Sequence, residues 1–484
     1  MMKKVKTGIL GLDEVLNGGL PENRLYLIDG DPGAGKTTLG LQFLLEGVAH
    51  GEKVLYVTLS ETRAEVQAVA TSHGWDISKI AVFELRTEDQ IEVDNQNTFF
   101  HPSEIELGET TKAILKVVQE IQPSRVVFDS LSELRLLARE SLRYRRQILA
   151  LKQYFSGKQT TVLLLDDRTS ENGDLDLHSL VHGVIRLEQL APEYGADRRR
   201  LRVLKLRGVG FRGGFHDFSL KRGGLQIYPR LIANEYQTAD EPTLLKSGVQ
   251  QLDTLLGGGI DRGSSTLFMG PAGSGKSTLA LQYAMAAAQA GEKTAIFAFD
   301  EGRRSILKRC QGIGFEIEKF LSNGTIRLQQ VDPAELAPGE FVDLVCQAVE
   351  KDNVRVLIID SLNGYINAMP EERFLIIQMH ELLSYLNQKG VATFLVVAQH
   401  GLIGANMNSP VDVSYLADTV VLLRYFEAQG HVRKAVSVLK RRSGPHEKAI
   451  REISFSEKGI KVGEPLEGFQ GVLTGVPDRL PLGN

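Results

Sequence analysis

The chain has 484 residues, of which 42% are hydrophobic and 24% charged, the balance of a globular protein with room for two or more domain cores. Its 56 Lys and Arg residues face 60 Asp and Glu residues, which gives a net charge of −4. This balance excludes a chain-wide attraction to nucleic acid or to an anionic membrane, although it does not exclude a local basic patch.

The sequence predicts neither a membrane span nor a secretory leader. The apolar run from Val391 to Ala398 has the length of a buried strand and falls well short of the roughly 18 residues that a spanning helix needs. The N-terminal segment has no continuous apolar stretch of the signal-peptide kind. Cys310 and Cys346 lack metal-ligand spacing, so we exclude a disulfide scaffold and a zinc module and expect a cytoplasmic location.

The first half of the chain predicts strands that alternate with helices. A short apolar strand at 25–28 leads into a glycine-rich loop, and residues 37–49 carry apolar side chains at helical spacing. Continuous apolar strands that alternate with helices favour a parallel, mostly buried sheet. Further strands are expected at 53–59, 125–129, 160–166 and 183–190, followed by an antiparallel pair at 198–208 and 215–229.

The second half repeats the first. The segment that begins at Thr7 aligns without a gap with the one that begins at Ser247, and the match continues to Gly51 and Gly291. An offset of 240 residues (247 minus 7) is far too long for a solenoid and indicates a duplicated domain. The corresponding strands are expected at 294–299, 355–360, 391–397 and 419–425, with an antiparallel pair at 433–443 and 448–462.

These patterns predict two tandem α/β domains. Each would be a mostly parallel twisted sheet flanked by helices, with a C-terminal antiparallel hairpin. The polar stretch 233–242 interrupts the periodicity, and we place the boundary in it, with domains at 1–237 and 238–484.

Each half contains a phosphate-binding loop between a strand and a helix. Gly30 to Thr37 and Gly270 to Ser277 both fit G-x-x-x-x-G-K-[ST], whose backbone N–H groups surround phosphates. The lysine would reach the β- and γ-phosphates, and the following hydroxyl would bind Mg²⁺. A chance glycine loop is the alternative, and two matches at equivalent positions argue against it. The predicted nucleotide-binding residues are Gly30, Gly33, Ala34, Gly35, Lys36, Thr37 and Thr38, and Gly270, Gly273, Ser274, Gly275, Lys276, Ser277 and Thr278.

Two aspartates are candidates for the Mg²⁺ site. Asp129 and Asp360 each end a buried strand and are each followed by Ser-Leu. A carboxylate at this position holds the Mg²⁺ of P-loop enzymes together with the loop hydroxyl, here Thr37 or Ser277. The alternative is that each aspartate only caps the following helix.

Acidic residues also follow the strand after each P-loop helix. These are Glu61, preceded by Ser60, and the pair Asp300-Glu301. A carboxylate at this place could polarise an attacking water or hydroxyl group. The alternative is an acid that faces solvent at the end of a strand.

The C-terminal strands of both halves carry paired cations. Lys205 and Arg207, like Lys440 and Arg442, are two residues apart, which puts both cations of a pair on one face of a strand. Such a pair could reach the γ-phosphate at a neighbouring subunit's site. The alternative is a solvated strand face.

In combination, these and further motifs make the whole chain similar to the KaiC family, two-domain members of the RecA-like ATPase superfamily. The resemblance covers about residues 5–470. It rests on S-G-V-x-x-L-D before the P-loop, residues 61–76 (ETRAEVQAVATSHGWD), Ile359–Leu362 (IDSL), Leu416–Tyr425 (LADTVVLLRY) and His446–Val462.

The resemblance implies an activity and an assembly. It implies ATP hydrolysis in the N-terminal ring, kinase and phosphatase activity in the C-terminal ring, and a homohexamer with ATP and Mg²⁺ held between subunits. It also implies regulatory protein partners of the Kai type.

The sequence departs from the family at three places that bear on catalysis. The family's paired glutamates become Ser60-Glu61, with one acid, and Asp300-Glu301, with a shorter first acid. The family's Ser-Thr phosphoacceptors fall on Ser414-Tyr415, so Ser414 is the expected acceptor. Ser409 matches a nearby hydroxyl that the family uses as a relay. The family's long C-terminal tail, which binds an activating partner, is expected to be largely missing.

Two other functions compete with this interpretation. One is a recombinase or helicase of the same superfamily, which the acidic balance and the absence of a lysine-rich stretch argue against, so we do not expect nucleic acid as a partner. The other is an ATP-bound scaffold with vestigial hydrolysis, which Ser60 makes tenable for the first half. Nucleotide binding without phosphate release would favour the scaffold.

Overall fold

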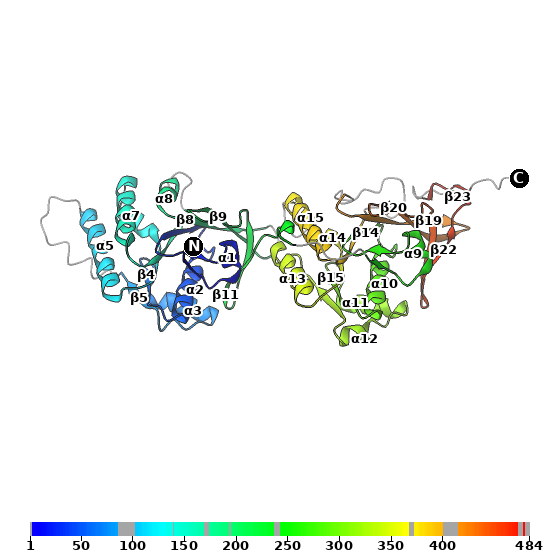
Figure 1. The fold of residues 1–484 in the computed structure, drawn as a ribbon, viewed down its shortest axis with the longest axis horizontal. Coiled ribbons are helices and arrows are strands. Elements are labelled where there is room, and N and C mark those ends of the chain that lie inside the picture. Colours follow the sequence, from blue (N-terminus) through cyan, green and yellow to red (C-terminus); the bar gives the residue numbers. More distant parts are fainter. Residues whose placement is uncertain are drawn as a thin grey trace. The chain divides into compact units, whose positions relative to one another are not determined.

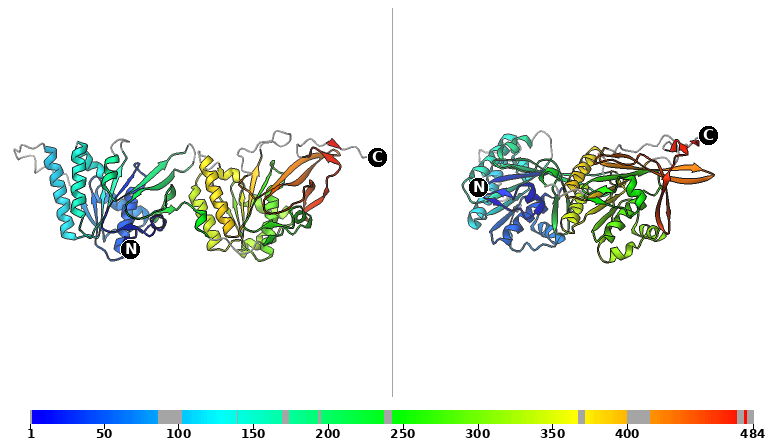
Figure 2. Two further views of the ribbon diagram at one scale, coloured as in Figure 1. Left: turned by 45° about the horizontal axis from the view of Figure 1, so that its top comes forward. Right: turned by 45° about the vertical axis from the view of Figure 1, so that its right-hand side comes forward.

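The computed structural model describes residues 2–85, 102–138, 140–168, 174–192, 195–236, 243–366, 372–399, 415–472 and 478–479. The chain divides into two compact units, Met1–Arg230 and Leu231–Asn484, each with its own nine-stranded sheet (Figures 1 and 2). The division lies just before the polar stretch in which we predict the joint. No helix within the described ranges is long and apolar enough to cross a membrane.

The sheet of the first unit is parallel at one side and antiparallel at the other. Its order is β11-β10-β9-β8-β3-β7-β6-β4-β5, and every ladder from β8 to β5 is parallel. The ladders from β8 to β11 are antiparallel. The strands are β3 (Leu25–Gly30), β4 (Val54–Thr58), β5 (Ala81–Glu84), β6 (Arg125–Asp129), β7 (Thr161–Asp167), β8 (Gly183–Leu190), β9 (Arg198–Leu206), β10 (His216–Lys221) and β11 (Gly224–Tyr228).

Two apolar layers cover this sheet, because successive side chains of a strand point to opposite faces. In β3, Tyr26 and Ile28 belong to the core beneath α2 and α3, whereas Leu25 and Leu27 belong to the core beneath α5 to α8. The central strand is therefore buried on both faces. The helices are α1 (Leu10–Val15), α2 (Lys36–Ala49), α3 (Arg63–His73), α5 (Pro102–Ile121), α6 (Leu131–Ala138), α7 (Ser141–Phe155) and α8 (Asp174–Leu180), and β1 (Lys4–Val5) pairs with β2 (Leu20–Pro21).

The sheet of the second unit repeats this topology. Its order is β16-β15-β17-β18-β14-β19-β20-β21-β22, again with parallel ladders from the first edge to β19 and antiparallel ladders beyond it. The strands are β14 (Ser265–Gly270), β15 (Thr294–Ala298), β16 (Ile326–Gln330), β17 (Val356–Asp360), β18 (Ala392–Ala398), β19 (Thr419–Ala428), β20 (His431–Arg441), β21 (Arg451–Ser456) and β22 (Gly459–Pro465), with short pairs β12 (Leu244–Leu245) with β13 (Ile260–Asp261) and β23 (Phe469–Gln470) with β24 (Asp478–Arg479).

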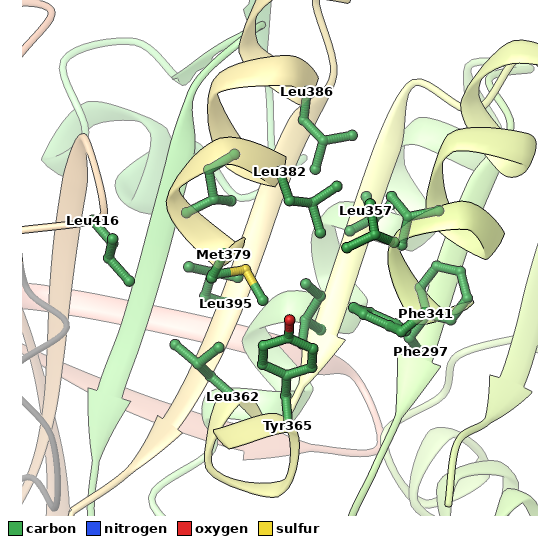
Figure 3. Close-up of a cluster of buried hydrophobic side chains, with 14 of the residues drawn as sticks. Phe297, Phe341, Leu357, Leu362, Tyr365, Met379, Leu382, Leu386, Leu395 and Leu416 are labelled. Atoms are coloured by element: carbon green, nitrogen blue, oxygen red, sulfur yellow. The ribbon is translucent and has the colours of Figure 1, made fainter. Parts of the chain in front are cut away.

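Aromatic packing fixes the helices on one face of the second sheet. Phe341 of α13 meets Phe297 of β15 edge-to-face with ring centroids 5.3 Å apart, and Tyr365 of α14 lies 5.3 Å from the same phenylalanine (Figure 3). This packing holds α14 directly after β17, the strand that ends at Asp360. The helices are α9 (Gln250–Leu255), α10 (Lys276–Gln289), α11 (Arg303–Gly312), α12 (Ile317–Ser322), α13 (Pro338–Glu350), α14 (Leu362–Ile366) and α15 (Glu372–Gln388), with a 3₁₀ turn at Ala233–Glu235.

The predicted α/β class is confirmed in both units. The sequence did not predict the edge strands β5 and β16, because each has a neighbour on one side only and is half exposed. Such strands lack the continuous apolar run that identifies a central parallel strand.

Candidate nucleotide sites

Both P-loops follow the central strand of a sheet and end in the first turn of a long helix. β3 ends at Gly30 and α2 begins at Lys36, while β14 ends at Gly270 and α10 begins at Lys276. The residues predicted for nucleotide binding lie at the end of β3 or β14, in the connecting loop, or in the first turn of α2 or α10. Free N–H groups at the helix start and the helix dipole make each loop a favourable place for phosphate.

The last glycine of each loop cannot be replaced by a larger residue. Gly35 has φ 99° and Gly275 has φ 107°, in the left-handed region. A Cβ at Gly35 would lie 2.6 Å from a methyl carbon of Leu220, and one at Gly275 would lie 2.2 Å from the ring of Phe455. The C-terminal strands β10 and β21 therefore pack against the loops. Glycine is required at these positions both because a side chain would clash with these strands and because φ is left-handed.

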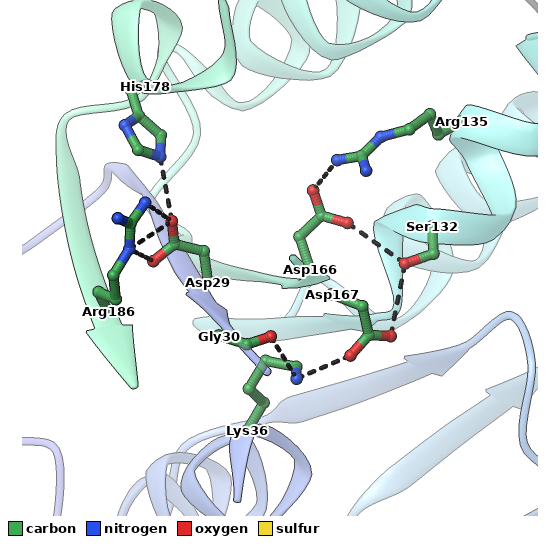
Figure 4. A network of polar contacts seen from close by, with 9 residues as sticks. All are labelled: Asp29, Gly30, Lys36, Ser132, Arg135, Asp166, Asp167, His178 and Arg186. Carbon is green, nitrogen blue, oxygen red and sulfur yellow. Dashed lines mark hydrogen bonds and ion pairs between the residues drawn. The ribbon is translucent and has the colours of Figure 1, made fainter. Parts of the chain in front are cut away.

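In the first unit the Lys36 side chain is buried at the loop. Its Nζ donates a hydrogen bond to the carbonyl oxygen of Gly30 (3.0 Å) and forms an ion pair of 2.7 Å with Asp167 Oδ1 (Figure 4). It also donates a hydrogen bond to the carbonyl oxygen of Asp31 (2.8 Å). The ammonium group is thus directed back over the loop, where a phosphate would bind.

The predicted magnesium ligands of the first unit are in contact. Thr37 Oγ1 donates a 2.7 Å hydrogen bond to Asp129 Oδ2, and the Tyr56 hydroxyl donates to the same oxygen. Burial raises the pKa of Asp129, and these two hydrogen bonds oppose the rise. A hydroxyl and a carboxylate side by side are the hard oxygen ligands that Mg²⁺ prefers, so the residues fit this ion.

Glu61 lies in the turn after β4, and its position is set by the backbone. The Thr58 hydroxyl donates to the Glu61 carbonyl oxygen (2.6 Å) and accepts from the Glu61 N–H (3.0 Å). Within the described ranges, no donor reaches the buried Glu61 Oε2. Burial, followed by the nearby charge of Asp129, raises the pKa of this carboxyl group. A carboxylate with a raised pKa and an oxygen without a described donor has the acceptor capacity that a general base needs.

In the second unit the Lys276 side chain is equally buried. Its Nζ donates to the Pro271 carbonyl oxygen at 2.7 Å, and burial lowers its pKa to about 8 although the charge of Asp360 opposes this. Burial raises the pKa of Asp360, and a hydrogen bond with Ser277 lowers it. The second unit therefore also brings its predicted lysine, hydroxyl and aspartate together.

The acids after β15 each have a described side-chain partner. The Ser361 hydroxyl donates to Asp300 Oδ2, and Arg309 of α11 forms an ion pair with Glu301. Ser60, which stands where the second unit has Asp300, is exposed. The two sites thus share their phosphate-binding parts and differ in how their acids are held.

The paired cations do not lie at the P-loop of their own unit, and only Lys205 and Lys440 lie within the strands β9 and β20, since Arg207 and Arg442 directly follow them. Lys205 pairs with Val184 near the amino end of β8, whereas the P-loop starts beyond the carboxyl end of β3. The four side chains bind carbonyl oxygens before β8 and β19: Lys205 on His178, Arg207 on Ser179 (2.8 Å), Lys440 on Ala417 (2.9 Å) and Arg442 on Tyr415 (2.9 Å). Their role at a neighbouring subunit's site stays a prediction.

The predicted phosphoacceptor Ser414 and the hydroxyl of Ser409 lie outside the described residues. Tyr415, the next residue, is described and 49% exposed.

The sequence did not predict the buried charge network beside the first P-loop (Figure 4). Asp29 accepts from Arg186 (2.7 Å) and lies 3.1 Å from His178 Nε2, and Arg135 forms an ion pair with Asp166. Although burial alone would raise it, the pKa of Asp29 is lowered by His178 and Arg186. The sequence repeat nevertheless contains a signal that could have identified this network.

That signal is a set of charged residues opposite apolar ones in the second unit. By strand register, Asp29, Asp166, Asp167 and Arg186 correspond to Met269, Val397, Ala398 and Leu422. Burying a charged side chain costs free energy. Charged residues in the first unit at positions that are apolar in the second unit therefore indicate a specific role.

Comparison with known proteins agrees with the duplication. The family description "ATPase: KaiC" matches residues 5–232 and again 245–467. The two mostly parallel sheets, their flanking helices and the terminal antiparallel strands are the architecture of tandem RecA-like domains.

Similar full-length proteins are clock proteins by name. The circadian clock protein KaiC3 of Synechocystis sp. is 26% identical, over 98% of this chain and 95% of its own. The circadian clock oscillator protein KaiC of Parathermosynechococcus lividus is 26% identical, over 99% of this chain and 88% of its own. The KaiC of Synechococcus elongatus is also 26% identical, over 99% and 92%.

Proposed function

The chain belongs to the KaiC family of ATPases, and on this premise we propose that it binds and hydrolyses Mg-ATP at both P-loops and acts as a serine autokinase and autophosphatase in its second domain. We take the domains as residues 1–237 and 238–484, and the role as signalling or clock-like regulation. The observation that carries the proposal is the convergence, in both units, of a P-loop lysine, a hydroxyl and a strand-end aspartate: Lys36, Thr37 and Asp129, and Lys276, Ser277 and Asp360.

Hydrolysis at the first site follows from the positions of Lys36 and Glu61. Lys36 and the loop N–H groups hold the phosphates, and Glu61 orients a water molecule in line with the γ-phosphorus. The water oxygen bonds to phosphorus, the bond to the β-phosphate oxygen breaks, and the water proton passes to the Glu61 carboxylate. The unpaired Glu61 Oε2 supports this role.

Thr37 with Asp129, and Ser277 with Asp360, would hold Mg²⁺ at the two sites. When bound, the ion would neutralise charge that develops on the β- and γ-phosphates.

At the second site we propose phosphoryl transfer to Ser414. The serine oxygen bonds to the γ-phosphorus, ADP leaves, and the hydroxyl proton passes to Asp300 or Glu301. Support comes from the resemblance to the family and from the two acids that follow β15, each held by a described partner, Ser361 or Arg309.

We further propose a homohexamer in which ATP lies between subunits, with regulatory partners of the Kai type. The cations at the ends of β9 and β20 support the assembly, since strand register keeps Lys205 away from the P-loop of its own unit and Arg207 binds the Ser179 carbonyl oxygen. An arginine or lysine supplied by a neighbour is a common way to stabilise the transferred phosphoryl group.

The test is incubation of the purified chain with γ-labelled Mg-ATP, following free phosphate and label kept on the chain. We expect both, with Lys36→Ala removing phosphate release by the first site and Lys276→Ala removing label from the chain. Release without labelling would leave an ATPase and overturn the kinase. Nucleotide binding with neither would favour the ATP-bound scaffold, which the exposed Ser60 keeps as a second candidate.

A further inference from the structure

The P-loop lysine of the first unit is held by an acid from a neighbouring strand. Asp167 is the last residue of β7, and its backbone pairs with Gly30, the first residue of the P-loop. This register directs the Asp167 carboxylate to Lys36 Nζ, at 2.7 Å. Lys36 is 7% exposed and Asp167 is 31% exposed, so the pair is only partly screened by water.

Three oxygen atoms surround the ammonium group of Lys36. Lys36 Nζ donates hydrogen bonds to the carbonyl oxygens of Gly30 and Asp31, and the Asp167 carboxylate adds an ion pair at 2.7 Å. A phosphate oxygen that binds Lys36 therefore competes with these acceptors. Asp167 is the only charged one of the three, so it is also the acceptor that a second anion would repel.

The surroundings give Asp167 a weaker second partner. The Ser132 hydroxyl lies 3.5 Å from Asp167 Oδ2 and 3.3 Å from Asp166 Oδ1 (Figure 4). Arg135, the nearest cation of α6 in this network, already pairs with Asp166. Release from Lys36 thus exchanges a charged partner for a neutral hydroxyl, which costs free energy.

The second unit has the same backbone without the acid. There Gly270 pairs with Ala398, which has no carboxylate, and Lys276 donates to the Pro271 carbonyl oxygen. Asn363, which follows β17 as Ser132 follows β6, hydrogen-bonds the backbone N–H (3.0 Å) and carbonyl oxygen (3.3 Å) of Ala398. The duplication therefore contains a control for the effect of Asp167.

We propose that Asp167 sets the nucleotide affinity of the first site by competing with the nucleotide's phosphates for the Lys36 ammonium. Mg-ATP binding then displaces Asp167 toward Ser132. The free energy that is needed to break the Lys36–Asp167 ion pair reduces the net free energy of binding. The inference rests on the proposed function, in that it takes the first P-loop to bind ATP. It adds a residue that limits this binding.

The test measures binding of Mg-ATP by equilibrium dialysis in chains with one intact P-loop. In a Lys276→Ala background, where the first site is intact, Asp167→Asn should tighten binding roughly tenfold, a typical coupling between two competing interactions. Asn keeps the size of Asp and removes its charge. Asp167→Glu keeps the charge and should stay close to the parental affinity. Glu61→Gln removes one negative charge beside the site without releasing Lys36, and should tighten binding much less than Asp167→Asn.

The reciprocal variant uses the second unit. In a Lys36→Ala background, Ala398→Asp should weaken Mg-ATP binding at the second site. Measurable binding that Asp167→Asn leaves unchanged, or that Glu61→Gln tightens equally, would overturn the inference and leave the proposed function standing. Failure of every Lys276→Ala chain to bind Mg-ATP, while the parental chain binds it, would overturn ATP binding at the first site and this inference with it.

Discussion

The Thr37 hydroxyl donates a 2.7 Å hydrogen bond to Asp129, a residue that lies 92 positions further along the chain. The contact exists because β6 and β3 end at the same edge of one parallel sheet, with β7 between them. Carboxyl ends of parallel strands are where α/β proteins bind ligands. The same pairing of hydroxyl and aspartate recurs in the second unit as Ser277 and Asp360.

The first prediction concerns the metal. Asp129→Asn should lower the affinity of the first site for ATP in the presence of Mg²⁺, because a neutral amide is a poorer ligand for a hard cation. Without Mg²⁺, in excess chelator, the variant and the parental chain should bind ATP equally. Titration of ATP with and without Mg²⁺ in a Lys276→Ala background checks this, and equal loss in both conditions would contradict a metal-ligand role.

The second prediction is a pH dependence. Burial raises the pKa of Glu61, and a general base works only when deprotonated, so hydrolysis at the first site should rise with pH through this raised pKa and fall in acid. Glu61→Gln should slow phosphate release roughly 100-fold or more and remove this dependence.

The measurement is phosphate release against pH in a Lys276→Ala background. Lys36→Ala in the same background supplies the blank. If Glu61→Gln kept the parental rate and pH profile, another group would have to activate the water.

The third prediction exchanges part of the charge network for its apolar counterpart. Asp29→Met should destabilise the first unit by about 3–5 kcal/mol, because the partly buried Arg186 would lose its ion pair with Asp29. Asp29→Met combined with Arg186→Leu copies Met269 and Leu422 of the second unit and should recover most of this loss. Urea unfolding of both variants checks this, and equal losses in the single and double variants would contradict it.

The same network should make the first unit sensitive to acid. The pKa of folded Asp29 is below its usual value of 3.8, so the network's stabilisation is present above pH 3.8 and is lost as the pH falls through the lowered pKa. The double variant should lose less stability than the parental chain over this range.

The fourth prediction concerns assembly. Mg-ATP should convert the chain into a hexamer, because nucleotide bound between subunits links binding to association. Light scattering with and without Mg-ATP measures the mass, and a monomer in saturating Mg-ATP would exclude the proposed assembly. Lys205→Ala combined with Arg207→Ala should weaken the hexamer if these cations complete a neighbour's site.

The fifth prediction is the phosphoacceptor. Mass spectrometry after incubation with Mg-ATP should find phosphate on Ser414, and Ser414→Ala should remove it while phosphate release continues. Label that persists in Ser414→Ala would place the acceptor elsewhere. Tyr415→Phe removes the neighbouring hydroxyl group, so phosphate that persists in this variant is not on Tyr415.

The amino-acid sequence by itself determined the features that depend on short segments. The P-loops, the strand-end aspartates Asp129 and Asp360, and the α/β class follow from glycine spacing and hydrophobic periodicity, which act over a few residues. The gapless repeat then extended each conclusion from one half to the other. The half-exposed edge strands β5 and β16 were missed, because their few residues carry too little periodicity.

Only the tertiary structure decided which charged groups meet at the sites. Asp167 reaches Lys36, and Arg186 reaches Asp29, because β7 and β8 flank β3 in the sheet although they follow it by more than a hundred residues in the chain. Strand order of this kind depends on how helices cross over the sheet, and no local pattern encodes it. For the same reason the sequence showed that Glu61 and Glu301 are equivalent, whereas the fold left Glu61 Oε2 without a described donor and gave Glu301 an ion pair with Arg309.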